Sequence, residues 1–172
     1  VEQSLTQSFV ACISDSIFYA SSKETSILSI AEMKQRIIES ITLDSFMGYQ
    51  NGNLVEDFYP GVSQSEKIDI NKKHSTSRLY QKLDFSLESN ILLYKKVVSS
   101  YENFQKFIQD PTVIIDETYL WDLVCAPNKS IFPLGINLVI FHIPEADMTS
   151  NVEILCPSNH YSSNSYDPTK YT

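Results

Sequence analysis

Apolar side chains recur every three or four residues along most of the chain, which is the period of an amphipathic helix. In residues 8–20 this period places on one face Phe9, Cys12, Ile13, Ile17 and Ala20. The tetrad Ser29-Ile30-Ala31-Glu32 has the spacing of a capping box, so a second helix is expected to begin there and continue to Ile41. The longest pattern covers residues 86–109 and is expected to end at Asp110-Pro111, because proline disfavours helical backbone in the residue before it.

Shorter helical segments and one polar segment separate these patterns. A short helix is expected over residues 43–49, ended by Asn51-Gly52, with a further turn over residues 54–58. Asp116 is placed to cap another short helix. Residues 61–77 are rich in serine and lysine and offer few side chains to a core, so we interpret them as an exposed loop.

The pattern changes towards the C-terminus, where two segments have the length and composition of β-strands. Residues 137–143 form a continuous apolar run that is typical of a buried strand. Residues 152–156 form a second such segment, and the turn-forming residues 147–151 between them favour a hairpin. Helices followed by strands predict an α+β fold: a helix-rich N-terminal half packed on a small, mostly antiparallel sheet, with the helix of residues 8–20 against it.

Length and charge restrict the class of protein. A chain of 172 residues with 42% hydrophobic side chains is expected to form a single globular domain over residues 1–172. Its formal net charge of −8 argues against sequence-independent binding of nucleic acid, which requires a basic face. No apolar run approaches the roughly 20 residues of a membrane span. The chain begins with Val1 and ends soon after an Asp-Pro turn, so we expect it to be a piece of a larger protein.

Metal and cofactor sites are not predicted. Three cysteines, an odd number in apolar surroundings, favour a reducing and therefore intracellular compartment. The three histidines and three cysteines are scattered without the spacing of a zinc site. Only four glycines are present, and they form no phosphate-binding loop. His74 lies in the polar segment and is expected to be solvated, and His142 lies in a strand and is expected to be structural.

Two segments at opposite ends of the chain carry candidate catalytic residues. Ser8 stands where a helix begins, and His160 follows the last strand, which is the chain order of papain-type thiol hydrolases. A helix N-terminus favours a thiolate, and a neighbouring imidazole can accept its proton. Each residue also has a structural interpretation: Ser8 as an ordinary capping serine, Cys12 as a small apolar side chain one turn further on, and His160 as an exposed loop residue.

The same segments resemble the ovarian-tumour-domain (OTU) family of cysteine proteases, which cleave ubiquitin from proteins. Gln7-Ser8-Phe9-Val10-Ala11-Cys12-Ile13 is similar to the family's Asn-Cys-Leu-Phe-x-Ala-Ile, with Ser8 in the place of the nucleophile. Leu120-Trp121-Asp122-Leu123 looks like the family's helix before its central strand. His160-Tyr161-Ser162 resembles the closing His-Tyr/Trp-Asn/Asp, with Ser162 in the place of the acid. The resemblance implies a papain-like fold, Ser8 as nucleophile position, His160 as base and Ser162 as third residue.

The expected function is therefore an OTU-like domain that engages the tail of ubiquitin or a ubiquitin-like protein, with activity weakened or absent because a serine holds the nucleophile position. That serine fits either a degenerate member or a cysteine deliberately replaced. Scarce arginine and abundant lysine, asparagine and isoleucine suggest an AT-rich genome such as that of a large DNA virus. This interpretation predicts a location in the cytoplasm or in the virion. It also predicts that other domains of the parent protein are partners. The alternative is a non-catalytic structural or virion interaction domain.

Overall fold

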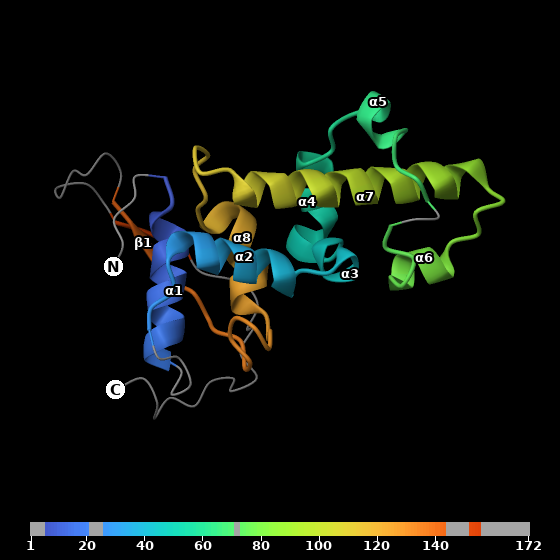
Figure 1. Ribbon diagram of the computed structural model, residues 1–172. Coiled ribbons are helices and arrows are strands. Elements are labelled where there is room, and N and C mark those ends of the chain that lie inside the picture. Colours follow the sequence, from blue (N-terminus) through green and yellow to red (C-terminus); the bar gives the residue numbers. More distant parts are fainter. Residues whose placement is uncertain (1–5, 21–25, 71–72, 144–151, 156–172) are drawn as a thin grey trace. The chain divides into compact units, whose positions relative to one another are not determined.

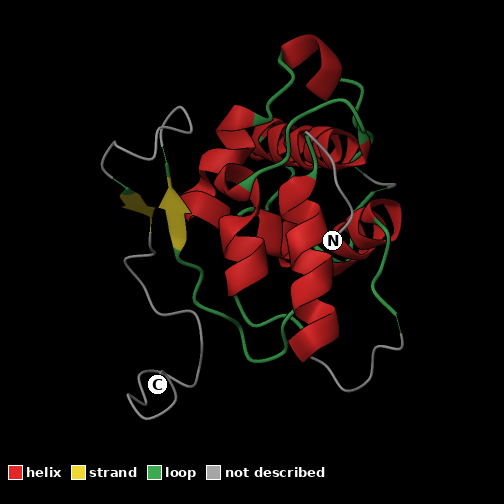
Figure 2. Cartoon of the chain, turned by 90° about the vertical axis from the view of Figure 1, so that its left-hand side faces the viewer, coloured by secondary structure: helices red, strands yellow, loops and turns green. Residues whose placement is uncertain are grey.

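The structure is a computed structural model that describes residues 6–20, 26–70, 73–143 and 152–155. The chain forms two compact units, Val1–Tyr119 and Leu120–Thr172, and each is described by itself. In the described residues helices predominate and the β-structure is one two-stranded antiparallel sheet, so the fold is α+β (Figure 2). The finer expectations, a papain-like architecture and a single domain over residues 1–172, stay predictions.

The described part of the first unit is helical (Figure 1). Its elements are α1 (Ser8–Ala20), α2 (Ile30–Ser40), α3 (Leu43–Phe46), the 3-10 turn η1 (Tyr49–Gly52), α4 (Asn53–Asp57), α5 (Val62–Ser65), α6 (Arg78–Lys82) and α7 (Glu88–Gln109). The helix α8 (Glu117–Cys125) crosses from this unit into the second. The longest helix, α7, is the centre of the unit, because α2, α3, α4 and α5 all contact it, while α1 contacts α2.

Local sequence signals explain where several of these helices begin and end. The predicted capping box is present: Ser29 Oγ accepts from the Glu32 amide at 3.3 Å, and Glu32 Oε2 accepts from the Ser29 amide at 2.9 Å. The Ser29 hydroxyl, which donates to Glu32 Oε2 at 2.7 Å, and the Ser29 amide together lower the pKa of the Glu32 carboxyl. After α3 the backbone is left-handed at Gln50, Asn51 and Gly52, the last with φ 92°, and this interrupts the helix before α4. Within the expected helix of residues 43–49 only Leu43–Phe46 is α-helical, and the chain then turns into η1.

An aromatic cluster forms the core around α7. Phe104 of α7 lies with its ring centroid 4.9 Å from that of Phe58 and 5.3 Å from that of Phe46. Phe46 and Phe104 are 0% exposed. The neighbouring Tyr101 is buried as well, and its hydroxyl donates to the Ile41 carbonyl at 2.8 Å. The chain leaving α2 is thus fixed to α7 by a buried hydrogen bond as well as by packing.

The prediction for residues 61–77 is wrong in part. The segment contains the short helix α5, and the side chains of Ser65, Ile68 and Ser77 are buried. Two long side chains of α7 hold the segment through its carbonyls: Lys95 Nζ donates to Glu66 O at 3.1 Å, and Tyr94 Oη donates to Lys73 O at 2.5 Å. Burial here depends on partners far away in the chain, which a local polar composition does not indicate.

The expected apolar face of α1 is rotated from its observed position. The buried side chains are Val10, Ala11, Ile13, Ser14 and Ile17, whereas Cys12 and Ala20 are exposed. The spacing from Val10 to Ile13, Ser14 and Ile17 is three, four and seven, which is one stripe on a helix. Ser14 belongs to this buried stripe because its hydroxyl donates to the Leu28 carbonyl at 2.6 Å. The sequence interpretation passed over it as a polar residue.

The second unit contains the antiparallel pair of strands that the sequence predicts, but the strands are short and mostly exposed, and the turn expected over residues 147–151 lies outside the described residues. The strands β1 (Ile140–His142) and β2 (Glu153–Leu155) pair antiparallel, with Phe141 opposite Ile154. Phe141 is 67% exposed and Ile154 is 60% exposed, so the expectation of a buried strand over residues 137–143 is wrong. In the described residues β1 pairs only with β2, and a two-stranded ribbon by itself leaves both of its faces open.

Candidate functional site

The start of α1 is held in place by the segment that follows α7. The Gln7 carbonyl accepts from the Ala11 amide at 3.1 Å, so Ser8 lies in the first turn of the helix, where its side chain is exposed. The Gln7 side chain is buried, and its amide donates to the Val113 carbonyl at 2.7 Å. Next to it, the Ile115 amide donates to the Thr6 carbonyl at 2.9 Å. These two hydrogen bonds therefore fix the backbone that leads into Ser8.

Lys34 supports the same segment from the side of α2. Its ammonium donates to the Asp110 carbonyl at 2.9 Å, and the side chain is buried. Burial lowers the pKa of Lys34, and the nearby Asp110 carboxylate opposes this shift. A cation at a terminal helix carbonyl is favourable because the C-terminal end of a helix carries partial negative charge. Gln7 and Lys34 therefore both immobilise the turn between α7 and residue 115.

Two of the candidate catalytic residues lie in the described part of the chain. Ser8 and Cys12 are both exposed, one helical turn apart on α1. Within the described residues no hydrogen bond joins Ser8 Oγ to a histidine or a carboxylate. Cys12 is the exposed thiol among the described cysteines, whereas Cys125 is 0% exposed and burial raises its pKa to about 11. Only Cys12 of this pair is accessible to a reagent.

The other two candidates, His160 and Ser162, lie outside the described residues. Whether His160 approaches Ser8 or Cys12 therefore stays a prediction. His142 has a structural partner: its Nδ1 lies 3.0 Å from Glu153 Oε2 on the neighbouring strand. Both of these side chains are exposed, and they form a cross-strand pair directly opposite each other in the hairpin.

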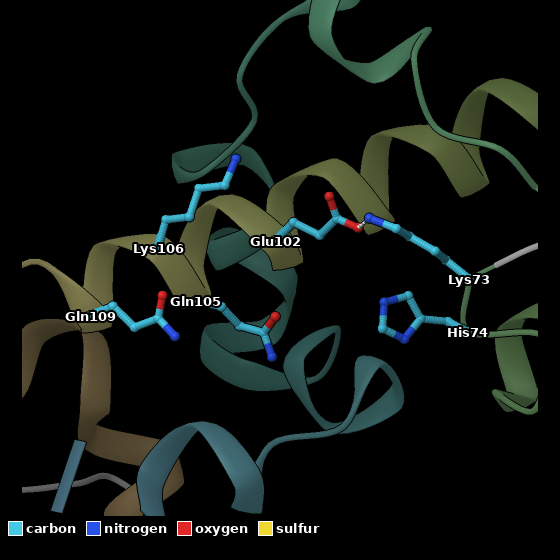
Figure 3. Close-up of a pocket in the computed structure, with 6 residues that line it drawn as sticks. All are labelled: Lys73, His74, Glu102, Gln105, Lys106 and Gln109. Carbon is cyan, nitrogen blue, oxygen red and sulfur yellow. Dashed lines mark hydrogen bonds and ion pairs between the residues drawn. The ribbon is translucent and has the colours of Figure 1, made fainter. Parts of the chain in front are cut away.

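A second candidate site is a polar groove beside α7 (Figure 3). Its volume is about 430 Å³, and the groove is lined by Lys73, His74, Glu102, Gln105, Lys106 and Gln109. The last four occupy positions i, i+3, i+4 and i+7 of α7 and so share one face of the helix. Lys73 Nζ lies 2.6 Å from Glu102 Oε1, an ion pair that joins the loop to the helix.

His74 is the unusual residue of this groove. The expectation that it is solvated is wrong: the residue is partly buried, and its ring meets that of Tyr101 edge to face, with centroids 5.2 Å apart. Its backbone is left-handed, with φ 56°, which is uncommon for a residue other than glycine. Burial lowers the pKa of His74, and the Glu102 carboxylate opposes the shift. In the described structure neither ring nitrogen has a hydrogen-bond partner.

Sequence reasoning did not find this groove. The polar positions of α7 look like the solvated side of an amphipathic helix, which they are elsewhere along its length. This face of α7 differs from a solvated one because Lys73 and His74 lie close to it. Their position depends on the contact between Lys73 and Glu102, which are 29 residues apart in the chain. The one local sign was the dipeptide Lys73-His74 in a segment otherwise interpreted as loop.

Among the described residues no group of histidine, cysteine, aspartate or glutamate side chains is arranged to hold a metal ion. Within those same ranges no helix combines the length and apolar character that crossing a membrane requires. Comparisons with models of protein families, with curated proteins and with solved structures found no match for this chain.

Proposed function

We propose that this protein is an OTU-like domain whose site for the tail of ubiquitin, or of a similar protein, lies at the start of α1. The observation that carries the proposal is the exposed position of Ser8 in the first turn of a helix whose entry is anchored by Gln7. Amides in the first turn of a helix lack partners within that helix and point towards an approaching oxygen. Such amides around Gln7 and Ser8 are suited to stabilise an oxyanion.

The chemistry at this position is acyl transfer to a side-chain nucleophile. The nucleophile at position 8 attacks the carbonyl of the last glycine in a Gly-Gly tail, and its proton passes to His160. His160 then protonates the amine that leaves as the acyl bond to residue 8 forms and the C–N bond breaks. With a serine hydroxyl in this place the step is slow, because the hydroxyl has no reactive anion at neutral pH. Ser162 lacks the carboxylate or amide that holds such an imidazole in its working orientation. The proposed activity is therefore weak or absent, and binding of the tail remains.

The experiment is covalent labelling with ubiquitin that carries a C-terminal electrophile. The proposal expects little labelling of the wild-type chain and clear labelling of Ser8→Cys, which a second substitution, His160→Ala, removes. Cys12→Ala in the Ser8→Cys background is the matched control, because it removes the neighbouring exposed thiol and should leave labelling intact. Labelling of the wild-type chain that disappears in Cys12→Ala would show that Cys12 is the nucleophile.

A different observation favours the alternative, a non-catalytic interaction domain. The hairpin of the second unit exposes apolar side chains, among them Phe141, Val152 and Ile154. Large exposed patches of apolar side chains mark surfaces that contact proteins, membranes or ligands. Absence of labelling in every variant above, with circular dichroism unchanged, favours this function. Phe141→Lys should then keep the melting temperature while lowering the fluorescence of a dye that binds apolar surface.

A further inference from the structure

We propose that the groove beside α7 binds an acidic peptide segment, with Lys106 taking a carboxylate and the side-chain amides of Gln105 and Gln109 pairing with the peptide backbone. The inference is independent of the OTU-like proposal, because the groove involves none of the residues discussed for that site. Figure 3 shows the arrangement: His74 and the Lys73–Glu102 pair stand at one end, and the remaining side chains follow along α7.

The charge of the groove is opposite to that of the chain. Glu102 is neutralised by its ion pair with Lys73, whereas Lys106 forms no ion pair with any described residue. Two lysines and one glutamate leave the groove with one net positive charge, in a protein whose formal net charge is −8. Salt screens distant charges over about 8 Å at physiological ionic strength, so a ligand in the groove is influenced mainly by Lys106.

The two glutamines indicate which chemical groups of the ligand lie beside its carboxylate. A glutamine amide offers both a donor and an acceptor, the same pair of groups as a peptide bond. Gln105 and Gln109 are one helical turn apart, and neither side chain has a hydrogen-bond partner in the described structure. The ridge from residue 102 to residue 109 is about 10 Å long at 1.5 Å per residue. That length accommodates about three residues of extended peptide at 3.3 Å each.

The composition of the groove argues against phosphate or nucleic acid as its ligand. Phosphate recognition favours the two-pronged guanidinium of arginine, and nucleic acid requires several cations along the backbone. The lining contains no arginine and a single lysine without an ion pair. One cation flanked by neutral amides matches an isolated carboxylate within a polar peptide better than a chain of phosphates.

His74 makes the binding depend on pH. Burial lowers the pKa of His74, and protonation of its imidazole would add a second positive charge to the lining, which favours an acidic peptide, so binding is coupled to uptake of a proton. Affinity is therefore expected to rise as pH falls from about 7 towards 5, before the ligand's own carboxylate is protonated. The titratable groups facing His74 are Lys73 beside it, Glu102 and Tyr101 on α7, and Asp44 on α3, which lines a second cavity with His74.

The test is a titration of the isotope-labelled full chain with a short glutamate-containing peptide, followed by NMR. We expect shifts of the side-chain amide signals of Gln105 and Gln109, and none with a peptide in which glutamine replaces glutamate. Lys106→Gln should weaken binding about tenfold, the usual effect of losing a charge-assisted hydrogen bond. Lys82→Gln is the matched control: Lys82 is exposed on α6, outside the groove, and its loss changes the net charge equally.

Each remaining outcome decides for or against the proposal. His74→Asn should abolish the rise in affinity at lower pH, because asparagine tolerates left-handed backbone and does not titrate. Equal weakening by Lys106→Gln and Lys82→Gln would overturn the proposal, because it would show attraction by overall charge alone. The proposal also fails if millimolar peptide produces no shift, or if a single-stranded oligonucleotide, and not the peptide, binds in a manner that depends on Lys106.

Discussion

At the scale of single residues, His74 combines left-handed backbone, an edge-to-face contact with Tyr101 and a lowered pKa. A group whose pKa is lower in the folded protein binds fewer protons than it does in the unfolded chain. The contribution of His74 to the free energy of unfolding is therefore complete above its unfolded pKa of about 6.5. That contribution is lost as the pH falls through the lower pKa of the folded protein. The fold should thus lose stability on mild acidification, before its carboxylates titrate.

The matching experiment compares urea unfolding of the wild-type chain and His74→Asn between about pH 7.5 and pH 5. The wild-type free energy of unfolding should fall over this range more than that of the variant, because asparagine does not titrate. The carboxylates with lowered pKa values, including Glu32, Asp84 and Asp110, titrate at lower pH and affect both proteins alike. Parallel pH profiles of the two proteins would contradict the prediction.

A second prediction at this scale concerns the two described cysteines. Cys12 is exposed, whereas Cys125 is 0% exposed and has a raised pKa, so the native protein should react with an alkylating reagent at Cys12 and not at Cys125. Mass spectrometry of the digested protein identifies the labelled peptides. Unfolding in urea should make Cys125 reactive, and Cys12→Ser should remove the label that the native protein carries on the Cys12 peptide. Equal native labelling of both thiols would show that the second unit opens readily.

At the scale of elements, the capping box at the start of α2 is a measurable contribution. Ser29→Ala removes the acceptor for the Glu32 amide and one arm of the box, and it should lower the free energy of unfolding by about 1 kcal/mol. Ser16→Ala on α1 is the control, since the Ser16 hydroxyl only bonds back to a carbonyl of its own helix. An equal loss of unfolding free energy in Ser16→Ala and Ser29→Ala would show that the capping box makes no specific contribution to stability.

Sequence reasoning succeeded at this scale where the determinants are local. The bounds of α1 and the Ser29 capping box follow from period and spacing alone, and the structure confirms both. It was wrong where distant partners decide: Ile68 is buried in a polar segment, Phe141 is exposed in an apolar one, and His74 meets Tyr101. The groove of α7 was missed for the same reason. Contacts between residues far apart in the chain leave no periodic signal.

At the scale of the whole molecule, the aromatic cluster on α7 stabilises the first unit. Phe104→Ala should lower the free energy of unfolding by about 3–5 kcal/mol, because it leaves a cavity between Phe46 and Phe58. Domains typically have about 5–15 kcal/mol of stability, so this loss is a large share. Leu92→Ala is the control on the same helix: Leu92 is 55% exposed, and its truncation should cost far less. Circular dichroism during urea titration measures both effects.

The anchoring of the α1 entry also has a consequence for the order of folding. The hydrogen bond from Gln7 to Val113 spans 106 residues of chain, and that from Ile115 to Thr6 spans a similar length. Contacts of such long range carry a large loop-closure entropy, so they form after local helices and slow the final assembly. During synthesis, α1 is made long before residue 115, and its first turn is anchored only after that residue has been added. A chain truncated before Val113 would still contain Ser8, on a helix with its entry unanchored.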